Sequence, residues 1–277
     1  MEEQEFFRRT GVARDPIMDK IHISCVGDSL VAAGERILLS MSAGKDSVAM
    51  FHLMREISDE MNLTIGVFHL NHGTRGEDSE ADAIFVRDLC AGYGYMFHSC
   101  RDSFNPTEPS FEKRARERRY ELLHEIAGKE KYDRIMTAHT KSDQAETVLM
   151  RLFTGTHISG LCAIPETRGK IVRPLLNCSS EEIVAYLKRN GFEWREDRSN
   201  EDTGYARNFI RHRVLPLIES RFPRSRDTIP DISDAAKENA ALIEEMAEMC
   251  GMKFKNDNSS TQIDFGKINV SRLIFNW

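Results

Sequence analysis

The chain has 277 residues, of which 40% are hydrophobic and 30% charged, with a net charge of −6. This is the composition of one large folded domain, or of one domain with a small appendage. The net negative charge argues against a protein that binds nucleic acid non-specifically over a large surface. No apolar run approaches the ~18 residues of a membrane helix, and the acidic first residues are unlike a signal peptide. Six cysteines without a CxxC pair indicate reduced thiols, so we expect a cytoplasmic protein.

Strand and helix patterns alternate along the first half of the chain. After a modest amphipathic helix over 16–33, strands are predicted at 36–42, 63–71, 95–101 and 132–138, and helices at 46–58, 77–92, 110–127 and 142–153. This order predicts an α/β fold with a doubly wound, mostly parallel sheet, whose ligands bind beyond the carboxyl ends of the strands. Ser42, Asn71 and His139 lie at such ends, so we expect them to meet in one crevice.

Beyond residue 154 the pattern is less regular, because glycine and proline are frequent up to residue 174. A capped helix is expected to begin at Ser179, since Glu182 stands three residues further on. Later elements are expected as a polar loop over 193–203, a helix that stops near Pro216, a helix over 231–250 and a short tail. We therefore expect one α/β domain over 1–220, with 221–277 as a helical linker and a short C-terminal part.

The most informative segment joins the first predicted strand to its helix. It reads Ser42-Ala43-Gly44-Lys45-Asp46-Ser47 and leads directly into a helical apolar pattern. Unpaired N–H groups at the start of a helix bind phosphate, so this segment predicts an anion site. It is not a Walker A loop, because Leu39 and Asp46 stand where that loop needs Gly and Ser or Thr. An ordinary strand–turn–helix junction is the alternative interpretation.

Four further segments carry residues suited to nucleotide or RNA chemistry. They are His69-Leu-Asn-His72-Gly-Thr-Arg75, Ala115-Arg116-Glu-Arg-Arg119-Tyr120, His139 with Asp143, Glu146 and Thr147, and Asp197-Arg-Ser-Asn200 followed by Arg207-Asn208-Phe-Ile210-Arg211. Together with the small loop they resemble, in order and spacing, the motifs of the tRNA(Ile)-lysidine synthetases, which belong to the PP-loop ATP pyrophosphatases. The resemblance covers about residues 36–220. Ala43 departs from it where glycine is usual, Thr74 where leucine is usual, and Ser142 where a first aspartate often stands.

The residues themselves support a chemical interpretation and a simpler one. Asp143 and Glu146 are three apart and share a helix face, where two carboxylates suit Mg²⁺; a surface face paired with Lys141 and Arg151 is the alternative. Arg116 with Tyr120, and likewise Arg207 with Arg211, have the four-residue spacing of helix neighbours, which suits phosphate and base contacts. Salt-bridged helix faces exposed to solvent are the alternative for both pairs. His69 and His72 would point in different directions, and no metal is assigned to them.

The resemblance implies a two-step ligation. The C2 carbonyl oxygen of the wobble cytidine attacks the α-phosphate of ATP, and the ε-amine of free L-lysine then displaces AMP. The implied partners are ATP, Mg²⁺, lysine and tRNA(Ile) with a CAU anticodon, without a membrane, in a monomer or homodimer.

The resemblance also implies a role for each motif residue. Residues implied to bind the nucleotide are Ser42, Ala43, Gly44, Lys45, Asp46, Ser47 and His139. Residues implied to be catalytic are Asp46, Asp143, Glu146, Arg116 and Arg207, with Asp46 and Asp143 holding the metal. Residues implied to bind tRNA are Arg75, Arg119 and Arg211.

Two other functions remain open from the sequence. A PP-loop tRNA 2-thiolation enzyme shares the ATP chemistry, but the chain has no CxxC pair, and Cys162 and Cys178 are isolated. A catalytically inactive RNA-binding relative is the non-enzymatic alternative, for which Ala43 is the only indication.

Overall fold

A six-stranded sheet forms the centre of the computed structural model, which describes residues 15–73, 76–102, 111–196, 204–249, 253–257 and 260–264. Its strand order is β3-β2-β1-β4-β6-β5. The strands are β1 (Arg36–Ser40), β2 (Thr64–Asn71), β3 (Met96–Arg101), β4 (Arg134–Thr137), β5 (Thr167–Arg168) and β6 (Ile171–Val172). All neighbours pair in parallel except β5 and β6, which are antiparallel. The predicted mostly parallel α/β sheet is confirmed.

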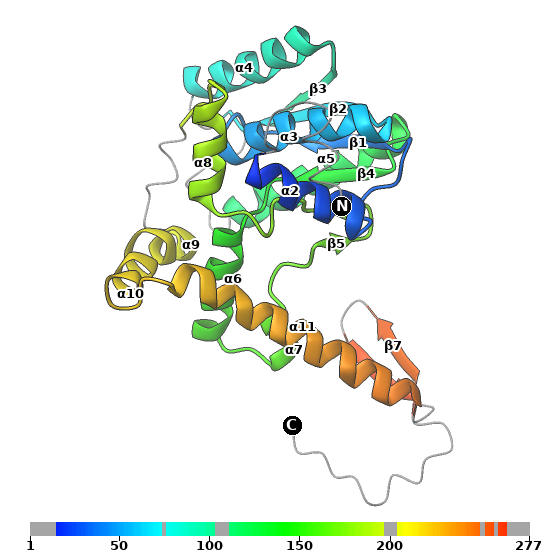
Figure 1. The fold of residues 1–277 in the computed structure, drawn as a ribbon, viewed down its shortest axis with the longest axis vertical. Helices are drawn as coiled ribbons and strands as arrows, with labels where there is room; N and C mark the ends of the chain where they lie inside the picture. Colours follow the sequence, from blue (N-terminus) through cyan, green and yellow to red (C-terminus); the bar gives the residue numbers. More distant parts are fainter. Residues whose placement is uncertain are drawn as a thin grey trace, which may run out of the picture.

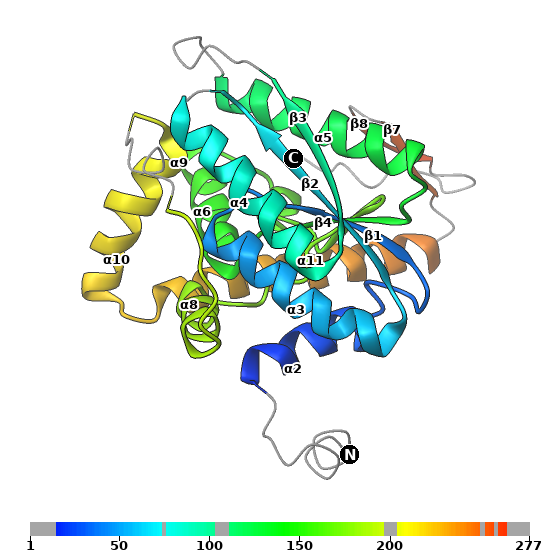
Figure 2. The ribbon, with the colours of Figure 1, turned by 90° about the horizontal axis from the view of Figure 1, so that it is seen from above.

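Helices cover both faces of this sheet (Figures 1 and 2). They are α2 (Pro16–His22), α3 (Lys45–Met61), α4 (Glu77–Tyr93), α5 (Phe111–Lys129), α6 (Lys141–Thr154), α7 (Ile158–Leu161), α8 (Ser180–Arg189), α9 (Ala206–Phe209), α10 (Leu215–Arg221) and α11 (Ser225–Met249), with π-helical turns η1 (Ile23–Gly27) and η3 (Ile210–Val214). None of the helices in the described part of the chain is long and apolar enough to cross a membrane.

The central strand β1 shows why the sheet is covered on both sides. Successive side chains of a strand point to opposite faces. Ile37 and Leu39 pack in a core with α2, α3 and α8, whereas Leu38 packs with Leu122 and Leu123 of α5 on the other face. Because both faces are buried, the strand is apolar at consecutive positions, as is usual for parallel sheets. The loop after β1 therefore lies on the α3 side and the start of α5 on the other.

Four expected elements differ from the structure. The helix expected over 16–33 is shorter, because α2 passes into η1 and the left-handed Ser29 (φ 56°) follows. Pro216 does not end a helix but lies in the first turn of α10, where its missing N–H costs nothing. The last long helix begins at Ser225 and accommodates Pro230 near its start. A hairpin, β7 (Lys253–Asp257) and β8 (Ser260–Asp264), occupies part of the expected tail.

The first half of α11 packs against α6 and α7. The Gln144 side chain of α6 donates to the Ile164 carbonyl at 2.9 Å and to Ser233 Oγ of α11 at 3.3 Å. Ser233 in turn donates to the Cys162 carbonyl at 2.8 Å. This helix therefore supports the element that carries the acidic residues, and the domain boundary at residue 220, which falls inside α10, stays a prediction.

A buried histidine of α3 predicts acid sensitivity. His52 is 2% exposed and stacks on Phe192 with ring centroids 3.5 Å apart. Burial, together with the charge of Arg55, lowers its pKa from 6.5 to about 4. The unfolded chain then binds more protons between these two values, so stability is lost as the pH falls through this window. By pH 5.5 the loss from His52 alone is expected to be about 1 kcal/mol in the free energy of unfolding.

Urea unfolding at pH 7.5 and pH 5.5 measures this loss. A His52→Gln variant is expected to be less stable at pH 7.5 but to lose about 1 kcal/mol less than the wild type between the two pH values. An equal loss in both proteins would contradict the assignment to His52.

Candidate active site

The segment after β1 forms a loop that is held by its own polar groups. Ser47 Oγ accepts a hydrogen bond from the Ser42 N–H at 3.2 Å and donates one to the Gly44 carbonyl at 2.9 Å. Gly44 is the N-cap of α3 and has no side chain to cap it, and none of the described residues caps that helix start. The Arg195 N–H also donates to the Ala43 carbonyl, at 3.1 Å. The first N–H groups of a 17-residue helix are thus free of a side-chain cap, as a phosphate site requires.

Ala43 adopts a conformation that favours glycine. Its φ is 67° and its side chain is fully buried. The left-handed region costs an L-residue about 1–2 kcal/mol. Glycine would remove this cost, but it would also lose a buried methyl group worth about 0.8 kcal/mol and add about 0.4–1 kcal/mol of unfolded-state freedom. These contributions nearly cancel, so alanine can stand where related motifs have glycine.

Substitution of Ala43 tests this balance. Ala43→Gly is expected to change the free energy of unfolding by less than about 1 kcal/mol, since the opposing contributions are similar. Ala43→Val is expected to destabilise the fold by about 2–4 kcal/mol, because a β-branched residue is strained at positive φ and overfills the core. Chemical denaturation measures both. A valine variant as stable as the wild type would contradict the description of this loop.

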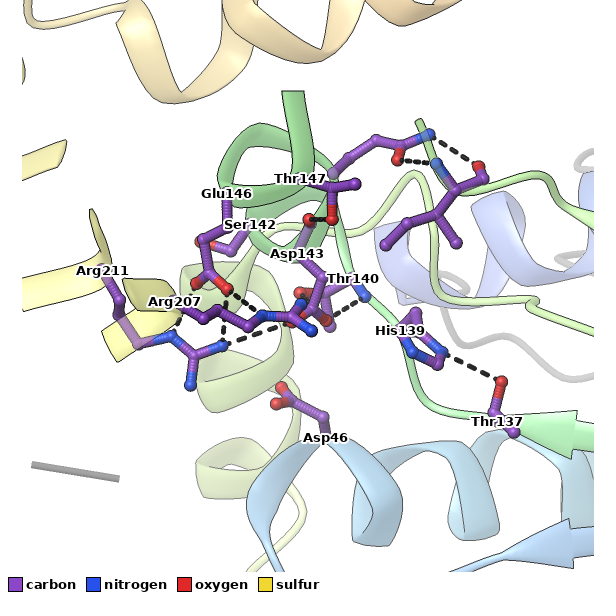
Figure 3. Close-up of polar contacts among 12 residues, drawn as sticks. Asp46, Thr137, His139, Thr140, Ser142, Asp143, Glu146, Thr147, Arg207 and Arg211 are labelled. Atoms are coloured by element: carbon purple, nitrogen blue, oxygen red, sulfur yellow. Dashed lines mark hydrogen bonds and ion pairs between the residues drawn. The ribbon is translucent and has the colours of Figure 1, made fainter. Parts of the chain in front are cut away.

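Two carboxylates of α6 meet two arginines from the segment after α8. Glu146, fully buried, accepts from Arg207 Nε at 2.7 Å and from Arg211 Nε at 2.6 Å. Asp143 Oδ1 accepts from Arg207 Nη2 at 2.7 Å and from Arg211 Nη2 at 3.3 Å (Figure 3). The alternative of a surface face paired with Lys141 and Arg151 is wrong, because the two carboxylates pair with arginines from a segment more than 60 residues away along the chain.

Asp143 is also fixed by the start of its own helix. Its Oδ2 accepts from the Thr140 N–H at 2.8 Å and from Thr140 Oγ1 at 3.1 Å, which forms a capping box. Burial raises the pKa of Asp143, but the charges of Arg207 and Arg211 and the Thr140 N–H outweigh burial, so its pKa lies below the ordinary value. Asp143 is therefore an ionised, fully hydrogen-bonded carboxylate.

Asp46 faces this cluster from the first turn of α3. Figure 3 shows its carboxylate pointing from α3 toward the side chains of Asp143 and Arg207. Burial raises the pKa of Asp46, Lys45 opposes the shift through a 2.6 Å ion pair, and the charge of Asp143 adds to it. The start of α3, with the phosphate-type loop, thus faces the acidic and basic residues of α6 and of the α9–η3 segment, and we refer to the region between them as the crevice.

His139 lies between β4 and α6 as predicted from its position at a strand end. Its Nδ1 is 3.0 Å from Thr137 Oγ1, and only 9% of the residue is exposed. Burial lowers its pKa, and nearby arginines add to this effect although Asp143 opposes it. His139 is therefore neutral at pH 7 and able to donate or accept one hydrogen bond at the crevice.

Some predicted residues lie elsewhere or outside the described chain. Asn71 donates to Glu80 Oε1 at 3.1 Å and accepts from the Gly73 N–H at 2.9 Å, so its side chain orders the turn that follows β2. His69 is buried against the Met41 carbonyl at 3.0 Å. Arg75, Asp197 and Asn200 lie outside the described residues.

Arg173 is the residue that our site prediction omitted. It is only 4% exposed and follows β6, close enough to Tyr120 and Arg116 for each to affect its pKa. Burial lowers the pKa of Arg173 most strongly. The only sequence signal is an arginine directly before Pro174, and nothing in the sequence places it beside α5.

The chain is similar in sequence to a known family and to several known proteins. A family profile of the PP-loop domain matches residues 20–218. The tRNA(Ile)-lysidine synthase of Chlorobaculum tepidum is 39% identical over 248 residues, which cover 88% of this chain and 74% of that protein. The enzyme of the same name from Symbiobacterium thermophilum is 35% identical over 246 residues, or 85% of this chain and 51% of that protein.

A solved structure adds evidence on the fold alone. The U34-tRNA thiolase NcsA of Methanococcus maripaludis, with its [4Fe-4S] cluster, superposes with a TM-score of 0.66 at 16% identity, covering 80% of this chain and 78% of that one.

The parallel sheet, the loop after its first strand and the matched profile define a PP-loop protein, a class that uses ATP. Within that class, the chain belongs to the tRNA(Ile)-lysidine synthase family. It spans about three quarters of the length of the Chlorobaculum relative and about half of the Symbiobacterium one.

Proposed function

We propose that this chain catalyses the ATP-dependent ligation of free lysine to C2 of the wobble cytidine of tRNA(Ile) with a CAU anticodon. In the first step the C2 oxygen attacks the α-phosphate of ATP, pyrophosphate leaves and the base is adenylated. In the second step the ε-amine of lysine attacks C2 and AMP leaves with that oxygen. One observation carries the proposal: the uncapped α3 loop and the Asp143–Glu146–Arg207–Arg211 cluster face one another across a single crevice, in a chain of this family.

We assign the phosphate loop to the pyrophosphate part of ATP. The N–H groups at the start of α3, with Ser42 and Lys45, would bind the anion that leaves in the first step. His139, neutral and at the strand end, would donate a hydrogen bond to the nucleotide. The arginines Arg116 and Arg207 would offset negative charge that develops on the α-phosphate, because guanidinium groups bind phosphate oxygens in pairs.

The hydrogen bonds of the acidic residues support a positioning role for them. Both oxygens of Glu146 are bonded to arginines, and those of Asp143 to arginines and Thr140. We propose that these carboxylates position Arg207 and Arg211 and that Arg211 contacts the anticodon loop at the rim of the crevice. Holding charged groups in place in this way supplies much of the rate acceleration in reactions that transfer a charged group.

The donor set fits Mg²⁺ in part. One carboxylate oxygen of Asp46 accepts a hydrogen bond from Lys45, so the other oxygen is available to bind Mg²⁺. A protein site for Mg²⁺ needs only one or two carboxylates besides phosphate oxygens. Asp143 can join only if it releases an arginine, because its oxygens already accept four hydrogen bonds. When bound, the ion would neutralise charge on the phosphates. We propose Asp46 as its main protein ligand.

The proposed reaction requires three reactants and a compartment that contains them. ATP, lysine and the anticodon loop of tRNA(Ile) would meet in the crevice, and the cytoplasm is the compartment that holds all three. A monomer or a homodimer is compatible with this assignment.

Release of AMP from labelled ATP tests the proposal. With a tRNA(Ile) transcript that carries the CAU anticodon, lysine is expected to start steady AMP release, while a transcript with U34 in place of C34 is expected to give none. AMP release that does not depend on lysine, or that continues with U34, would contradict the proposed reaction.

A further inference from the structure

A second concentration of positive charge lies at the start of α5 and after β6, close enough to His139 and Arg207 for charges to act between them. Arg116 and Arg119 of α5 have their guanidinium carbons 5.6 and 5.8 Å from the centre of the Tyr120 ring. Arg173, which follows β6, is close enough to Tyr120 to lower the pKa of its hydroxyl. Arg116, Arg119 and Tyr120 belong to α5, whereas Arg173 follows β6, which is the sheet neighbour of the strand β4 that α5 contacts.

Among the described residues, this group has no carboxylate partner of its own. None of the three guanidinium groups forms an ion pair with a carboxylate among the described residues, in contrast to Arg207 and Arg211. Within the described part of the chain, the guanidinium of Arg173 donates one hydrogen bond, to the Pro165 carbonyl at 2.6 Å. The Arg173 Nε, the Arg119 Nε and the Tyr120 hydroxyl are all buried, and no described residue forms a hydrogen bond with any of them.

Buried donors of this kind are costly unless something accepts from them. Burial is the main cause that lowers the pKa of Arg119 and of Arg173, and the charge of Arg116 adds to it in both. For Tyr120, burial raises the pKa, but the positive charges of the three arginines outweigh it and lower the pKa of the hydroxyl. An anion with several acceptor oxygens would relieve the repulsion and satisfy all three donors at once.

We propose that Arg119, Tyr120 and Arg173 form a phosphate-binding pocket separate from the phosphate loop. A phosphate group has the charge and the several oxygens that two guanidinium groups and a hydroxyl can bind together. Two sources offer that group: the phosphodiester backbone beside the target cytidine, and the phosphates of ATP. The pocket adjoins Arg207, whose charge affects Arg119, so either source would lie next to the proposed reaction site. The inference thus deepens the proposed function and rests on it for the identity of the RNA.

Binding measurements with two probes test the pocket. The probes are inorganic pyrophosphate and the anticodon stem-loop of tRNA(Ile), each titrated separately without lysine. Arg119→Gln and Tyr120→Phe are the main variants, because both residues are only half-buried and tyrosine and phenylalanine have nearly the same shape. Arg173→Lys is a third, with thermal unfolding as a check, since Arg173 also bonds to Pro165. Arg118→Gln is the matched control, as this arginine of α5 pairs with Asp102 and Glu121 instead.

We expect substitutions in the pocket to lower the affinity for a probe selectively. Arg119→Gln is expected to weaken one probe by about tenfold and Tyr120→Phe by about threefold, whereas Arg118→Gln changes either by less than about twofold. Loss of RNA affinity alone assigns the pocket to the phosphodiester backbone, and a methylphosphonate linkage beside C34 should then abolish the difference between variant and wild type. Loss of pyrophosphate affinity alone assigns it to ATP.

Unchanged affinity for both probes in Arg119→Gln and Tyr120→Phe would overturn the pocket, and so would an equal loss in Arg118→Gln. No turnover is needed in these titrations. A wild-type chain that binds the probes but releases no AMP would therefore overturn the proposed function and leave the pocket intact.

Discussion

Asp46→Asn is expected to lower the rate of AMP formation by at least about 100-fold, the effect of losing one electrostatic stabiliser at a reacting group. The substitution removes a negative charge at the start of α3 that faces Asp143 and the arginines. It keeps the shape of the side chain, and the carboxylate is not part of the apolar core. The fold is therefore expected to survive, which circular dichroism and chemical denaturation would check.

Asp59→Asn provides the matched control for this prediction. Asp59 is an exposed aspartate near the other end of the same helix, so its loss removes the same charge away from the crevice. The control is expected to retain the wild-type rate. Wild-type AMP formation in Asp46→Asn would exclude this carboxylate from the metal and pyrophosphate centre.

Glu146→Gln is expected to affect both stability and rate. Glu146 is fully buried and bonds both Arg207 and Arg211, whose side chains are 26% and 31% exposed. Breaking a buried ion pair costs about 3–5 kcal/mol, and partial exposure of the arginines reduces this to about 2–4 kcal/mol in the free energy of unfolding. The rate is expected to fall as well, because two arginines at the crevice lose the carboxylate that holds them.

An exposed pair on α11 serves as the control for Glu146. Asp234 pairs with Lys237 at 2.8 Å, with the two side chains 59% and 33% exposed. Asp234→Asn is expected to cost less than about 1 kcal/mol and to leave the rate unchanged. If Glu146→Gln were as stable and as active as Asp234→Asn, the cluster would be an ordinary salt-bridged surface.

The sequence predicted the local geometry of the site better than its long-range contacts. Asp143 and Glu146 were expected on one helix face because of their spacing, and they share one. Their partners could not be predicted, since Arg207 and Arg211 reach them only through the path of the chain after α8. Pairing across more than 60 residues depends on tertiary packing, which helical periodicity does not encode.

Short elements and side-chain competition explain the other differences. β5 and β6 have two residues each, too few for an alternating pattern to be detected. Asn71 was expected in the crevice because it ends a strand, but its amide bonds to Gly73 and Glu80, which order the following turn. Ala43 stood out in the sequence only as a departure from glycine, because alanine gives no local signal for its positive φ.

Mass spectrometry of the wobble nucleoside tests the central claim most directly. The chain would be incubated with ATP, Mg²⁺, isotopically labelled lysine and a CAU-anticodon tRNA(Ile) transcript, and the RNA would then be digested to nucleosides. We predict that cytidine 34 is converted to labelled lysidine, and that Asp46→Asn leaves it as cytidine. Unmodified cytidine with the wild-type chain, or 2-thiocytidine when a sulfur donor is supplied in place of lysine, would contradict the account.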